Sequence, residues 1–394
     1  MGRAAGATAF FLVVMMGLGG CGSRPAPRPH GARSHVRAAL PGPVRAAQLV
    51  AGETGWVLAA NVLAVTSDAG RTWTAVTPPG VRARLIRGVY FRDARRGWVV
   101  SARARDPGQL QLSMTADGGA TWRTTPIGRP DPVFASSETA PAYVDFADPR
   151  HGWVEAMTAT GSGVPAQGIL LHTSDGGATW QRLPAPAGGP VEFVNAAGGW
   201  LAPAAQPGTT AAGKLYVTRD AGRTWHPVAV TAPGYRPDQV TFTIPAFTAP
   251  SGVVLAAFDN GTRSAARFYQ TRDRGATWQP AAAVPARNPA HGDVTPAAAA
   301  AGPGNWWAVA IDGAVIAHVT QAGARQVITD PSWQPGPPGG IGDVSFTPAG
   351  AGWAVGNADR CAAFKSRCTD TIRLYATADG GRHWTRMLSR TEPI

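Results

Sequence analysis

The sequence predicts an all-β fold: a seven-bladed propeller of four-stranded antiparallel blades, preceded by a disordered N-terminal tether. Three observations support this prediction. An eight-residue phrase, Thr-x-Asp-x-Gly-x-(Thr/His)-Trp, occurs six times in the 394-residue chain. A Gly-Trp phrase that starts an apolar run recurs beside it, and short apolar runs separated by turn residues make up most of the remainder. Self-similarity at a period of about 50 residues indicates stacked repeating units.

The Asp phrase marks the same place in each unit. Its aspartates are Asp68, Asp117, Asp175, Asp220, Asp273 and Asp379, and its tryptophans are Trp73, Trp122, Trp180, Trp225, Trp278 and Trp384. The intervals between the aspartates are 49, 58, 45, 53 and 106 residues. Because the last interval is about double, we expect a decayed seventh copy at 319–326, with Gln321 in place of Asp and Gln326 in place of Trp.

The Gly-Trp phrase marks a second place in each unit. Its tryptophans are Trp56, Trp98, Trp153, Trp200, Trp307 and Trp353, and a version without Trp begins at Gly252. In four copies a phenylalanine lies seven residues before the tryptophan, at Phe91, Phe146, Phe193 and Phe346. Seven copies in all therefore favour seven blades.

Each unit contains four short runs. In the second unit these are 86–91, 97–102, 109–115 and 121–127. Short strands with turn signals every 8–12 residues are typical of all-β proteins. Four antiparallel strands repeated seven times fit a propeller, in which radial packing protects the sheet edges. The blades are expected at 44–79, 84–128, 139–185, 189–231, 239–285, 292–330 and 341–389, within a propeller domain at 44–390.

The Asp phrase has a structural explanation. It falls on the turn between the third and fourth strands, where Asp can accept backbone N–H groups and Gly can take a positive φ. A tryptophan buried between blades removes about 150–250 Å² from water, worth roughly 4–6 kcal/mol at most. Six copies around a ring also disfavour a catalytic role, since a reaction needs one site.

The N-terminus is expected to be a targeting segment. Residues 1–20 have the features of a signal peptide, with an apolar run at 9–20 too short to span a membrane comfortably. Leu18-Gly19-Gly20-Cys21 has the form of a bacterial lipobox, which makes Cys21 the predicted site of lipidation; an ordinary signal peptide is the alternative. Residues 21–43, rich in Pro and Arg, would then be a linker holding the propeller outside the cytoplasm on a membrane anchor.

Two cysteines remain after Cys21. Cys361 and Cys368 fall in the loop expected between the second and third strands of the last blade. An even pair outside the cytoplasm favours a disulfide, worth about 2.5 kcal/mol in the chain-entropy model. No spacing of His or Cys suggests a metal site, and no cofactor is expected.

The chain is basic, with a net charge of +12, and 34 of its 36 cationic residues are arginine. Such a surface would attract anionic lipids, acidic polymers or acidic protein loops. The arginine bias also fits a GC-rich genome, and a merely solvated basic surface remains the alternative. No segment resembles a nucleic-acid recognition module.

The strand order predicts two faces. Asp phrases mark one face, and the longer second-to-third loops mark the other, where binding usually occurs. Arg82, Arg84, Arg103 and Arg105 fall on this loop face, within a stretch of eight arginines and one acid, whereas Arg92, Arg95 and Arg96 fall on the Asp-phrase face. Arginine suits bidentate capture of carboxylate or phosphate, so these four are the candidate binding residues.

The Asp phrase resembles the Asp-box, or BNR repeat, of sialidases and the sortilin propeller. The resemblance covers 44–389, and the Phe-x6-Trp spacing with seven short units is most similar to the photosystem II assembly and stability factors. It implies a non-enzymatic, monomeric, extracytoplasmic propeller that binds a membrane or surface protein or assists complex assembly. It also implies an arginine-rich binding patch, for which Arg82 to Arg105 is the best counterpart.

The alternative function is a glycoside hydrolase or a glycan-binding protein. A sialidase-like site would need an arginine cluster and paired carboxylates. Glu192 and Asp145, at equivalent positions of neighbouring first strands, are the one plausible acid pair, and a structural role for them is preferred. The Arg-Ile-Pro phrase of sialidases is missing, and related xyloglucanases use two propellers where this chain has room for one.

Overall fold

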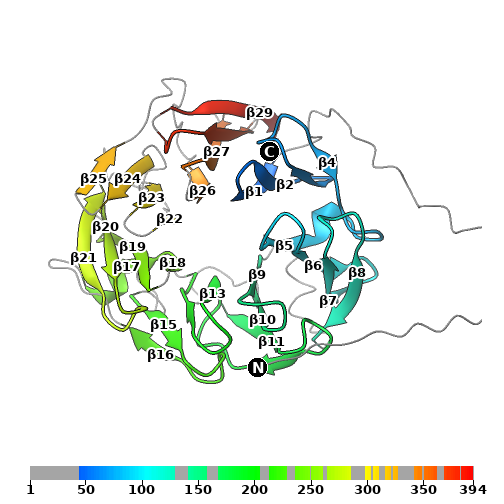
Figure 1. Cartoon of the computed structure of the whole chain (residues 1–394), viewed down its shortest axis with the longest axis horizontal. Helices are drawn as coiled ribbons and strands as arrows, with labels where there is room; N and C mark the ends of the chain where they lie inside the picture. The colour runs from blue at the N-terminus through cyan, green and yellow to red at the C-terminus, as the bar shows by residue number, and fades with distance from the viewer. Residues whose placement is uncertain are drawn as a thin grey trace, which may run out of the picture. The chain divides into compact units, whose positions relative to one another are not determined.

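The computed structural model describes residues 44–128, 141–157, 167–204, 213–228, 236–248, 250–260, 264–284, 298–302, 305–309, 316–320, 323–326, 341–347, 350–361, 368–381 and 383–393. All of them belong to the unit His35–Ile394. Within these residues the strands form seven antiparallel sheets arranged around a centre (Figure 1). Cys21, the signal peptide and the linker lie outside the described residues.

The first three sheets follow the chain in order. They contain β1 Val44–Ala51, β2 Thr54–Ala59, β3 Leu63–Thr66 and β4 Thr74–Ala75, then β5 Ile86–Phe91, β6 Gly97–Arg103, β7 Asp106–Thr115 and β8 Arg123–Ile127, then β9 Ala142–Phe146, β10 Gly152–Met157, β11 Gly168–Thr173 and β12 Gln181–Leu183. In each sheet the first strand lies innermost and every strand pairs with the next.

The other four sheets repeat this pattern. They contain β13 Val191–Phe193, β14 Gly199–Leu201, β15 Leu215–Thr218 and β16 His226–Val228; β17 Val240–Phe242, β18 Ala246–Thr248, β19 Ser251–Asp259, β20 Ser264–Thr271 and β21 Gln279–Val284; β22 Ala298–Gly302, β23 Asn305–Val309, β24 Ile316–Thr320 and β25 Gly323–Gln326; and β26 Ile341–Phe346, β27 Gly352–Cys361, β28 Cys368–Thr377 and β29 Thr385–Pro393. The predicted all-β propeller of four-stranded antiparallel blades is confirmed.

One sheet departs from the four-strand prediction. Its first strand is divided into β17 and β18, which both pair with β19, so this sheet has five strands. The break falls at 243–245, and Pro245 has no N–H to offer to the ladder. Thr243 keeps the two halves together, because its N–H donates to Leu255 O at 3.0 Å.

The expected decayed Asp phrase is a different turn. β24 ends at Thr320 and β25 starts at Gly323, and these two residues are paired across the hairpin. In the first sheet, by contrast, Thr66 and Thr74 bound a seven-residue connection. The prediction that residues 319–326 form a decayed Asp-phrase turn is therefore wrong, because Gly323 already belongs to the next strand. Gln321 lies outside the described residues.

The apolar core lies between neighbouring sheets. Trp153 of β10 is fully buried and stacks on Phe193 of the next sheet, with ring centroids 3.6 Å apart and planes 2° from parallel. Trp98 of β6 stacks in the same way on Phe146, at 4.1 Å. Trp200 likewise stacks on Phe247, so each of these three Gly-Trp tryptophans packs against a phenylalanine of the following blade.

The tryptophans of the Asp phrase pack less deeply than predicted. Trp122, Trp180, Trp225, Trp278 and Trp384 are only partly buried, and Trp73 alone among the six is buried. They meet the phenylalanines edge-on, as Trp180 meets Phe146 at 6.4 Å and 87°. The expectation of six deep inter-blade anchors is therefore wrong, because these tryptophans sit at the outer fourth strand and the Gly-Trp tryptophans occupy the interior.

The constant Phe-to-Trp spacing follows from the same packing. The phenylalanine ring lies directly on the glycine that precedes the tryptophan, and a Cβ added at Gly152 would lie 2.3 Å from Phe146. The same contact holds at Gly97, Gly199, Gly252 and Gly352. Glycine is required at this position because any side chain would displace the phenylalanine.

The first and last sheets close the ring through side chains. β1 packs against β26 and β27. The first sheet has Leu49 at the position of the missing phenylalanine, and Trp353 of β27 lies over Gly55 and 5.8 Å from Trp73. Each of these sheets takes all of its strands from its own repeat, so no strand is exchanged between them.

Candidate functional site

The Asp phrases and the first-to-second turns lie on one face of the ring. In six sheets the N–H of the residue after Asp donates to a carbonyl of the first-to-second turn of the same sheet, at 2.7–3.0 Å. The pairs are Ala69–Glu53, Gly118–Arg95, Gly176–Arg150, Ala221–Ala197, Arg274–Pro250 and Gly380–Gly350. We call this the Asp-box face, and the opposite side the loop face.

The carboxylate of each box aspartate accepts hydrogen bonds from groups of its own turn. Asp68 accepts hydrogen bonds from Thr66 Oγ1 at 2.7 Å, from the N–H of Thr72 at 2.8 Å and from Thr72 Oγ1 at 2.6 Å. The other five boxes repeat this arrangement, with His383 in place of the second threonine in the last. At least three hydrogen bonds to each carboxylate therefore serve the turn itself, which supports a structural role for these residues.

These hydrogen bonds keep the box carboxylates ionised. The hydroxyl and the N–H of Thr224 lower the pKa of Asp220 to about 2, and Thr271 and Thr277 do the same for Asp273. Hydrogen bonds to the charged form of a carboxylate have this effect in general. The predicted structural role of the six aspartates is consistent with this environment.

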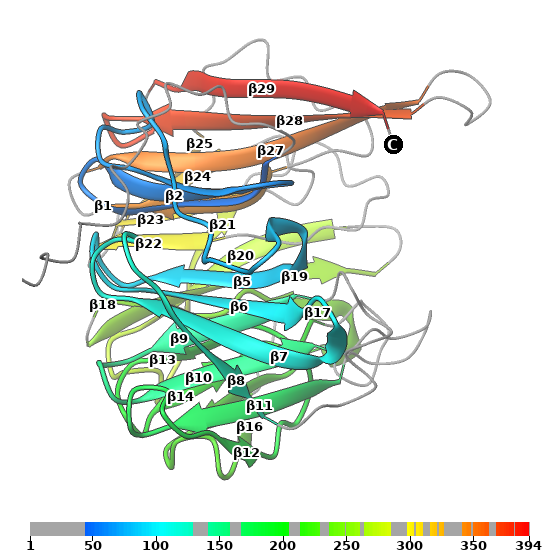
Figure 2. The ribbon, with the colours of Figure 1, turned by 90° about the vertical axis from the view of Figure 1, so that its right-hand side faces the viewer.

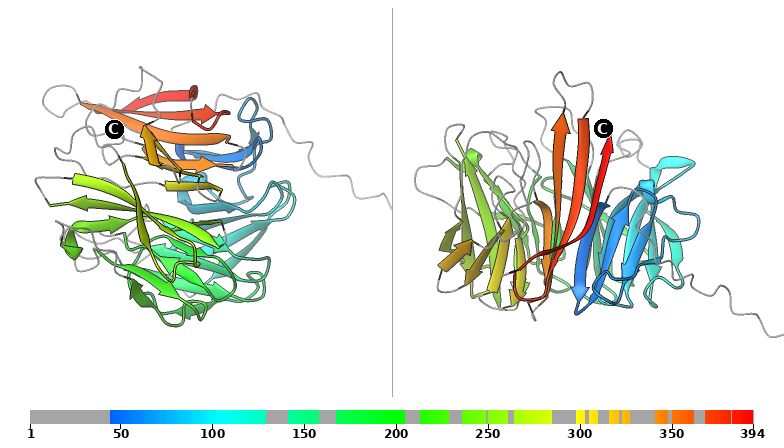
Figure 3. Two further views of the ribbon diagram at one scale, coloured as in Figure 1. Left: turned by 60° about the vertical axis from the view of Figure 1, so that its left-hand side comes forward. Right: turned by 90° about the horizontal axis from the view of Figure 1, so that it is seen from above.

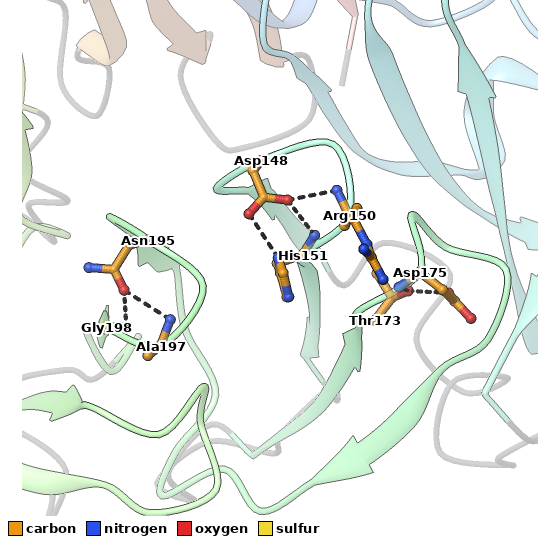
Figure 4. Close-up of polar contacts among 8 residues, drawn as sticks. All are labelled: Asp148, Arg150, His151, Thr173, Asp175, Asn195, Ala197 and Gly198. Atoms are coloured by element: carbon orange, nitrogen blue, oxygen red, sulfur yellow. Dashed lines mark hydrogen bonds and ion pairs between the residues drawn. The ribbon is translucent and has the colours of Figure 1, made fainter.

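A second side-chain cap on the Asp-box face was not foreseen from the sequence. Asp93, Asp148 and Asn195 occupy equivalent places in three first-to-second turns, two residues after the phenylalanine. Asp148 Oδ1 accepts the N–H groups of Arg150 and His151 at 2.7 and 2.9 Å, and Asn195 does the same for Ala197 and Gly198 (Figure 4). The phrase Phe-x-(Asp/Asn) would have revealed this cap.

The four candidate arginines lie together on the loop face. Arg82 precedes the short helix η1 (Ala83–Leu85), Arg84 lies within it, and η1 leads into β5. Arg103 ends β6, and Arg105 lies on the turn from β6 to β7. η1 contacts β6, so the two pairs belong to one surface. Arg92, Arg95 and Arg96 lie at the opposite end of these strands, as the Gly118–Arg95 hydrogen bond requires.

A fifth arginine fixes the backbone beneath this surface. Arg45 of β1 donates from Nη1 to Ala83 O at 3.3 Å and from Nη2 to Ile86 O at 3.1 Å. Its guanidinium is partly buried, and burial lowers its pKa from the usual value. Arg45 thus ties the first sheet to η1 and holds Arg82 and Arg84 in place, a role that no sequence pattern suggested.

The charge of the quartet is open to solvent. Arg82, Arg84, Arg103 and Arg105 are all exposed, and within the described part of the chain none of them makes an ion pair. Asp106, beside Arg105 in the chain, is the nearest acid in sequence. A fixed backbone carrying four free guanidinium groups suits an acidic partner.

The acid pair considered for glycoside hydrolysis lies on two neighbouring innermost strands. Asp145 of β9 is 8% exposed, and its Oδ2 accepts the N–H of Phe193 in the next sheet. Glu192 of β13 is partly buried, and burial followed by repulsion from Asp145 raises its pKa to about 8. This geometry supports the structural interpretation of both residues.

One further acid lies entirely inside the protein. Glu155 of β10 has no exposed surface, and burial raises its pKa well above the usual value. Its carboxyl lies against Gly168, and burial followed by the charge of Glu155 raises the pKa of Tyr143 to about 12. No sequence pattern singles Glu155 out, because its burial depends on the neighbouring sheet.

The two remaining cysteines end neighbouring strands. Cys361 is the last residue of β27 and Cys368 the first of β28, and their Cα positions are direct partners in the register. The sequence had suggested that both cysteines lie in the connecting loop. They lie instead at the ends of the two strands. Direct pairing is compatible with the predicted disulfide, which remains a prediction.

Two features are absent from the part of the chain that the structure describes. No group of three or more His, Cys, Asp or Glu among them could hold a metal ion. No helix in the same part of the chain is long and apolar enough to cross a membrane.

Comparison with known proteins places this ring in a family. The model of the family described as Photosynthesis system II assembly factor YCF48 matches residues 80–356. The Photosystem II assembly lipoprotein Ycf48 of Synechococcus sp. (strain CC9902) is 29% identical over 148 residues. The match spans 37% of this chain and 37% of that relative.

Solved structures share the architecture at low identity. An ancestral GH74 enzyme superposes with a TM-score of 0.50 at 12% identity. The superposition covers 87% of this chain and 54% of the chain of the GH74 enzyme. A structure from an analysis of two prolyl endopeptidases gives a TM-score of 0.50 at 10% identity, covering 89% of this chain and 50% of its own. This chain spans about half the length of either protein, and at these identities only the fold is shared.

Proposed function

The chain belongs to the photosynthesis system II assembly factor YCF48 family, and from this we propose that it is a non-enzymatic propeller that binds a membrane protein during assembly of a complex. The observation that carries the proposal is the exposed quartet Arg82, Arg84, Arg103 and Arg105, together with the bonds from Arg45 that hold the backbone around η1. The expected partner is an acidic segment of a membrane or cell-surface protein. Arginine pairs with carboxylates through two parallel hydrogen bonds, which supplies both affinity and orientation.

We also propose that Cys21 carries a lipid anchor at the outer face of a bacterial membrane. The lipobox-like sequence before Cys21 supports this, as does the word lipoprotein in the name of the Synechococcus relative. Anchoring would restrict the propeller to the membrane surface and raise its local concentration beside membrane partners. Retention of label from a radioactive fatty acid by the wild type, and its loss in Cys21→Ala, would test this.

A glycoside hydrolase is the less supported alternative. Of its one plausible acid pair, Asp145 is buried and accepts the N–H of Phe193, and Glu192 is partly buried. A general acid and a nucleophile must both reach the substrate. Purified protein is therefore expected to leave fluorogenic glycosides intact, and hydrolysis that Glu192→Gln abolishes would reverse this assignment.

The partner proposal predicts a charge-dependent interaction. Replacing Arg82, Arg84, Arg103 and Arg105 together by alanine should reduce partner recovery from native membranes by about tenfold or more, since each charge-assisted pair contributes appreciably. Recovery is measured by photo-cross-linked pull-down and quantitative mass spectrometry. Wild-type recovery should also fall as salt is raised.

A matched control comes from the opposite face. Arg95, Arg150, Arg219 and Arg272 are equally exposed on the Asp-box face, so their fourfold alanine variant loses the same charge. It should retain the partners of the wild type. Equal recovery from the two fourfold variants would reject the loop-face site.

A further inference from the structure

Glu155 departs from the pattern of the other blades. It is the second residue after the tryptophan of a Gly-Trp phrase, and side chains alternate along β10, so it shares the face of Trp153 that packs against the fourth sheet. The equivalent residues of four other sheets are apolar and buried: Leu58, Val100, Ala202 and Val355. A carboxyl thus occupies a place that the fold otherwise fills with an aliphatic side chain.

The surroundings of this carboxyl give it no partner. Glu155 has no exposed surface, and neither carboxyl oxygen has a hydrogen-bond partner in the part of the chain that the structure describes. An unpaired carboxylate in such a place is strongly unfavourable, whereas the protonated form is far less so. Burial therefore raises the pKa of Glu155 well above the usual value, although the N–H of Gly189 acts in the opposite direction.

The carboxyl lies beneath the chain segment that leads from the third blade to the fourth. A Cβ added at Gly168, the first residue of β11, would overlap Oε1 of Glu155 and lie 2.9 Å from Cα of Gly188, so these three groups converge. Gly188 belongs to the connection 184–190 between β12 and β13. This connection is held on the loop face by the fourth sheet, because the N–H of Ala204 donates to Gly188 O at 2.8 Å.

The groups that face Glu155 do not balance a charge on it. Its partner on β9 is Tyr143, which stays neutral because its pKa is raised to about 12, and its partner on β11 is Leu170. The next pair on this face, Asp145 and His172, lies opposite Trp153 toward the Asp-box face, and burial lowers the pKa of His172. The connection 184–190 and β14 contain no titratable side chain.

We propose that Glu155 is a proton-operated latch that holds the connection 184–190 down between the third and fourth blades. While it carries its proton, the carboxyl packs as the aliphatic residues of the other blades do, and the connection stays closed over it. Glu155 ionises when the connection lifts and water reaches the carboxylate. The connection is therefore closed in mild acid and opens more often as pH rises.

The direction of this effect follows from the raised pKa of Glu155. A carboxyl whose folded pKa lies above its unfolded value stabilises the folded state fully below the unfolded value, and this contribution is lost as pH rises through the folded value. In the open form Glu155 titrates as an exposed glutamate does, so opening releases one proton. The opening constant should rise about tenfold for each pH unit between the ordinary glutamate value and the raised value.

Amide hydrogen exchange in the full chain measures this opening. The protection factor of Ala204, corrected for the intrinsic exchange rate, should fall about tenfold per pH unit over that range, because its bond to Gly188 breaks when the connection lifts. Leu63 is an internal control, since its N–H donates to Thr77 Oγ1 at 2.8 Å in the first sheet, where Leu58 stands in place of the acid. Parallel falls at Ala204 and Leu63 would overturn the proposal.

Three variants test the role of the proton. Glu155→Gln keeps the size of the side chain but cannot ionise, and Glu155→Leu introduces the residue of the first sheet, so the pH dependence at Ala204 should disappear in both. Glu53→Gln is the matched control and should keep it, because Glu53 is exposed on the Asp-box face. A dependence that persists in Glu155→Leu would overturn the proposal even if Glu155→Gln did not fold.

Infrared spectroscopy gives an independent readout of the same proton. Near neutral pH the wild type should show the carbonyl stretch of a protonated carboxyl that the spectrum of Glu155→Leu lacks. Identical spectra of the two proteins in this region would mean that Glu155 is already ionised in the closed form, and the latch would be rejected.

Discussion

At the scale of the residue, the Asp-box requires two successive residues with positive φ. The glycine two positions after Asp adopts it in all six boxes, as the sequence predicts. The residue one position after Asp adopts it too, and in three boxes this is not glycine: Ala69, Ala221 and Arg274 have φ of 56, 65 and 56°. The left-handed region costs a residue with a side chain about 1–2 kcal/mol.

The strain at Arg274 can be removed by one substitution. Arg274→Gly should stabilise the protein by about 1 kcal/mol, since glycine takes this conformation freely, less the extra freedom that it gives the unfolded chain. Chemical denaturation measures the change. Arg272→Gly is the control, because Arg272 is equally exposed, lies two residues earlier and does not share the positive φ.

The control should lose stability by about 0.5–1 kcal/mol, since glycine there only loosens the unfolded chain. A loss of stability in both glycine variants would mean that the left-handed backbone at Arg274 is not strained.

At the scale of the element, each blade fastens to the next through its second strand. Trp153 of β10 is fully buried against Phe193, whereas Trp180, which begins the fourth strand of the same sheet, remains partly exposed. The inner part of a blade therefore carries most of the inter-blade packing. The outer strand follows the Asp-box turn, and the tryptophan beside it makes only an edge-on contact with the phenylalanine.

This difference predicts unequal costs for two tryptophans of one blade. Trp153→Ala should destabilise the protein by about 3–5 kcal/mol, because it leaves a large cavity between blades. Trp180→Ala should cost about 1–2 kcal/mol, since much of its side chain already meets water. Urea denaturation of the two variants measures the contrast, and equal losses would contradict the packing described here.

The sequence predicted the local parts of this structure well. The strands at 86–91 and the Asp-box turns follow from alternation, glycine positions and hydrogen bonds that close within eight residues. It did not predict contacts that depend on a neighbouring sheet. The burial of Glu155, the bond that Asp145 accepts from the next blade, and the relative depth of Trp153 and Trp180 all required the ring itself, because no short-range pattern specifies a partner about 50 residues away.

At the scale of the whole molecule, the fold shifts the pKa values of two classes of carboxyl in opposite directions. Six Asp-box carboxylates are held ionised by hydrogen bonds, and four of them, Asp68, Asp220, Asp273 and Asp379, have pKa values of about 2. Asp145, Glu192 and Glu155 have raised values because of burial. The first class stabilises the fold above the ordinary Asp value, and the second stabilises it below the raised values.

Stability should therefore pass through a maximum at about pH 4–5. Below about pH 4 the box carboxylates become protonated as the pH falls toward 2, and their contribution disappears in all six turns. Above pH 5 the buried acids lose their stabilising protons. Thermal unfolding followed by tryptophan fluorescence from pH 2 to 9 measures this curve. A midpoint that keeps rising to pH 8 would show that the buried acids do not titrate as described.

The closure of the ring also has a consequence for how the protein is made. Figure 2 and Figure 3 show the long strands β27 and β28 in the sheet beside the first one, although the chain reaches them last. Trp353 covers Gly55 and approaches Trp73, so the outward apolar side of the first sheet has no cover until β27 has been synthesised. For most of translation this apolar surface of the first sheet is exposed. The growing chain must therefore be protected from aggregation until the last blade has been synthesised.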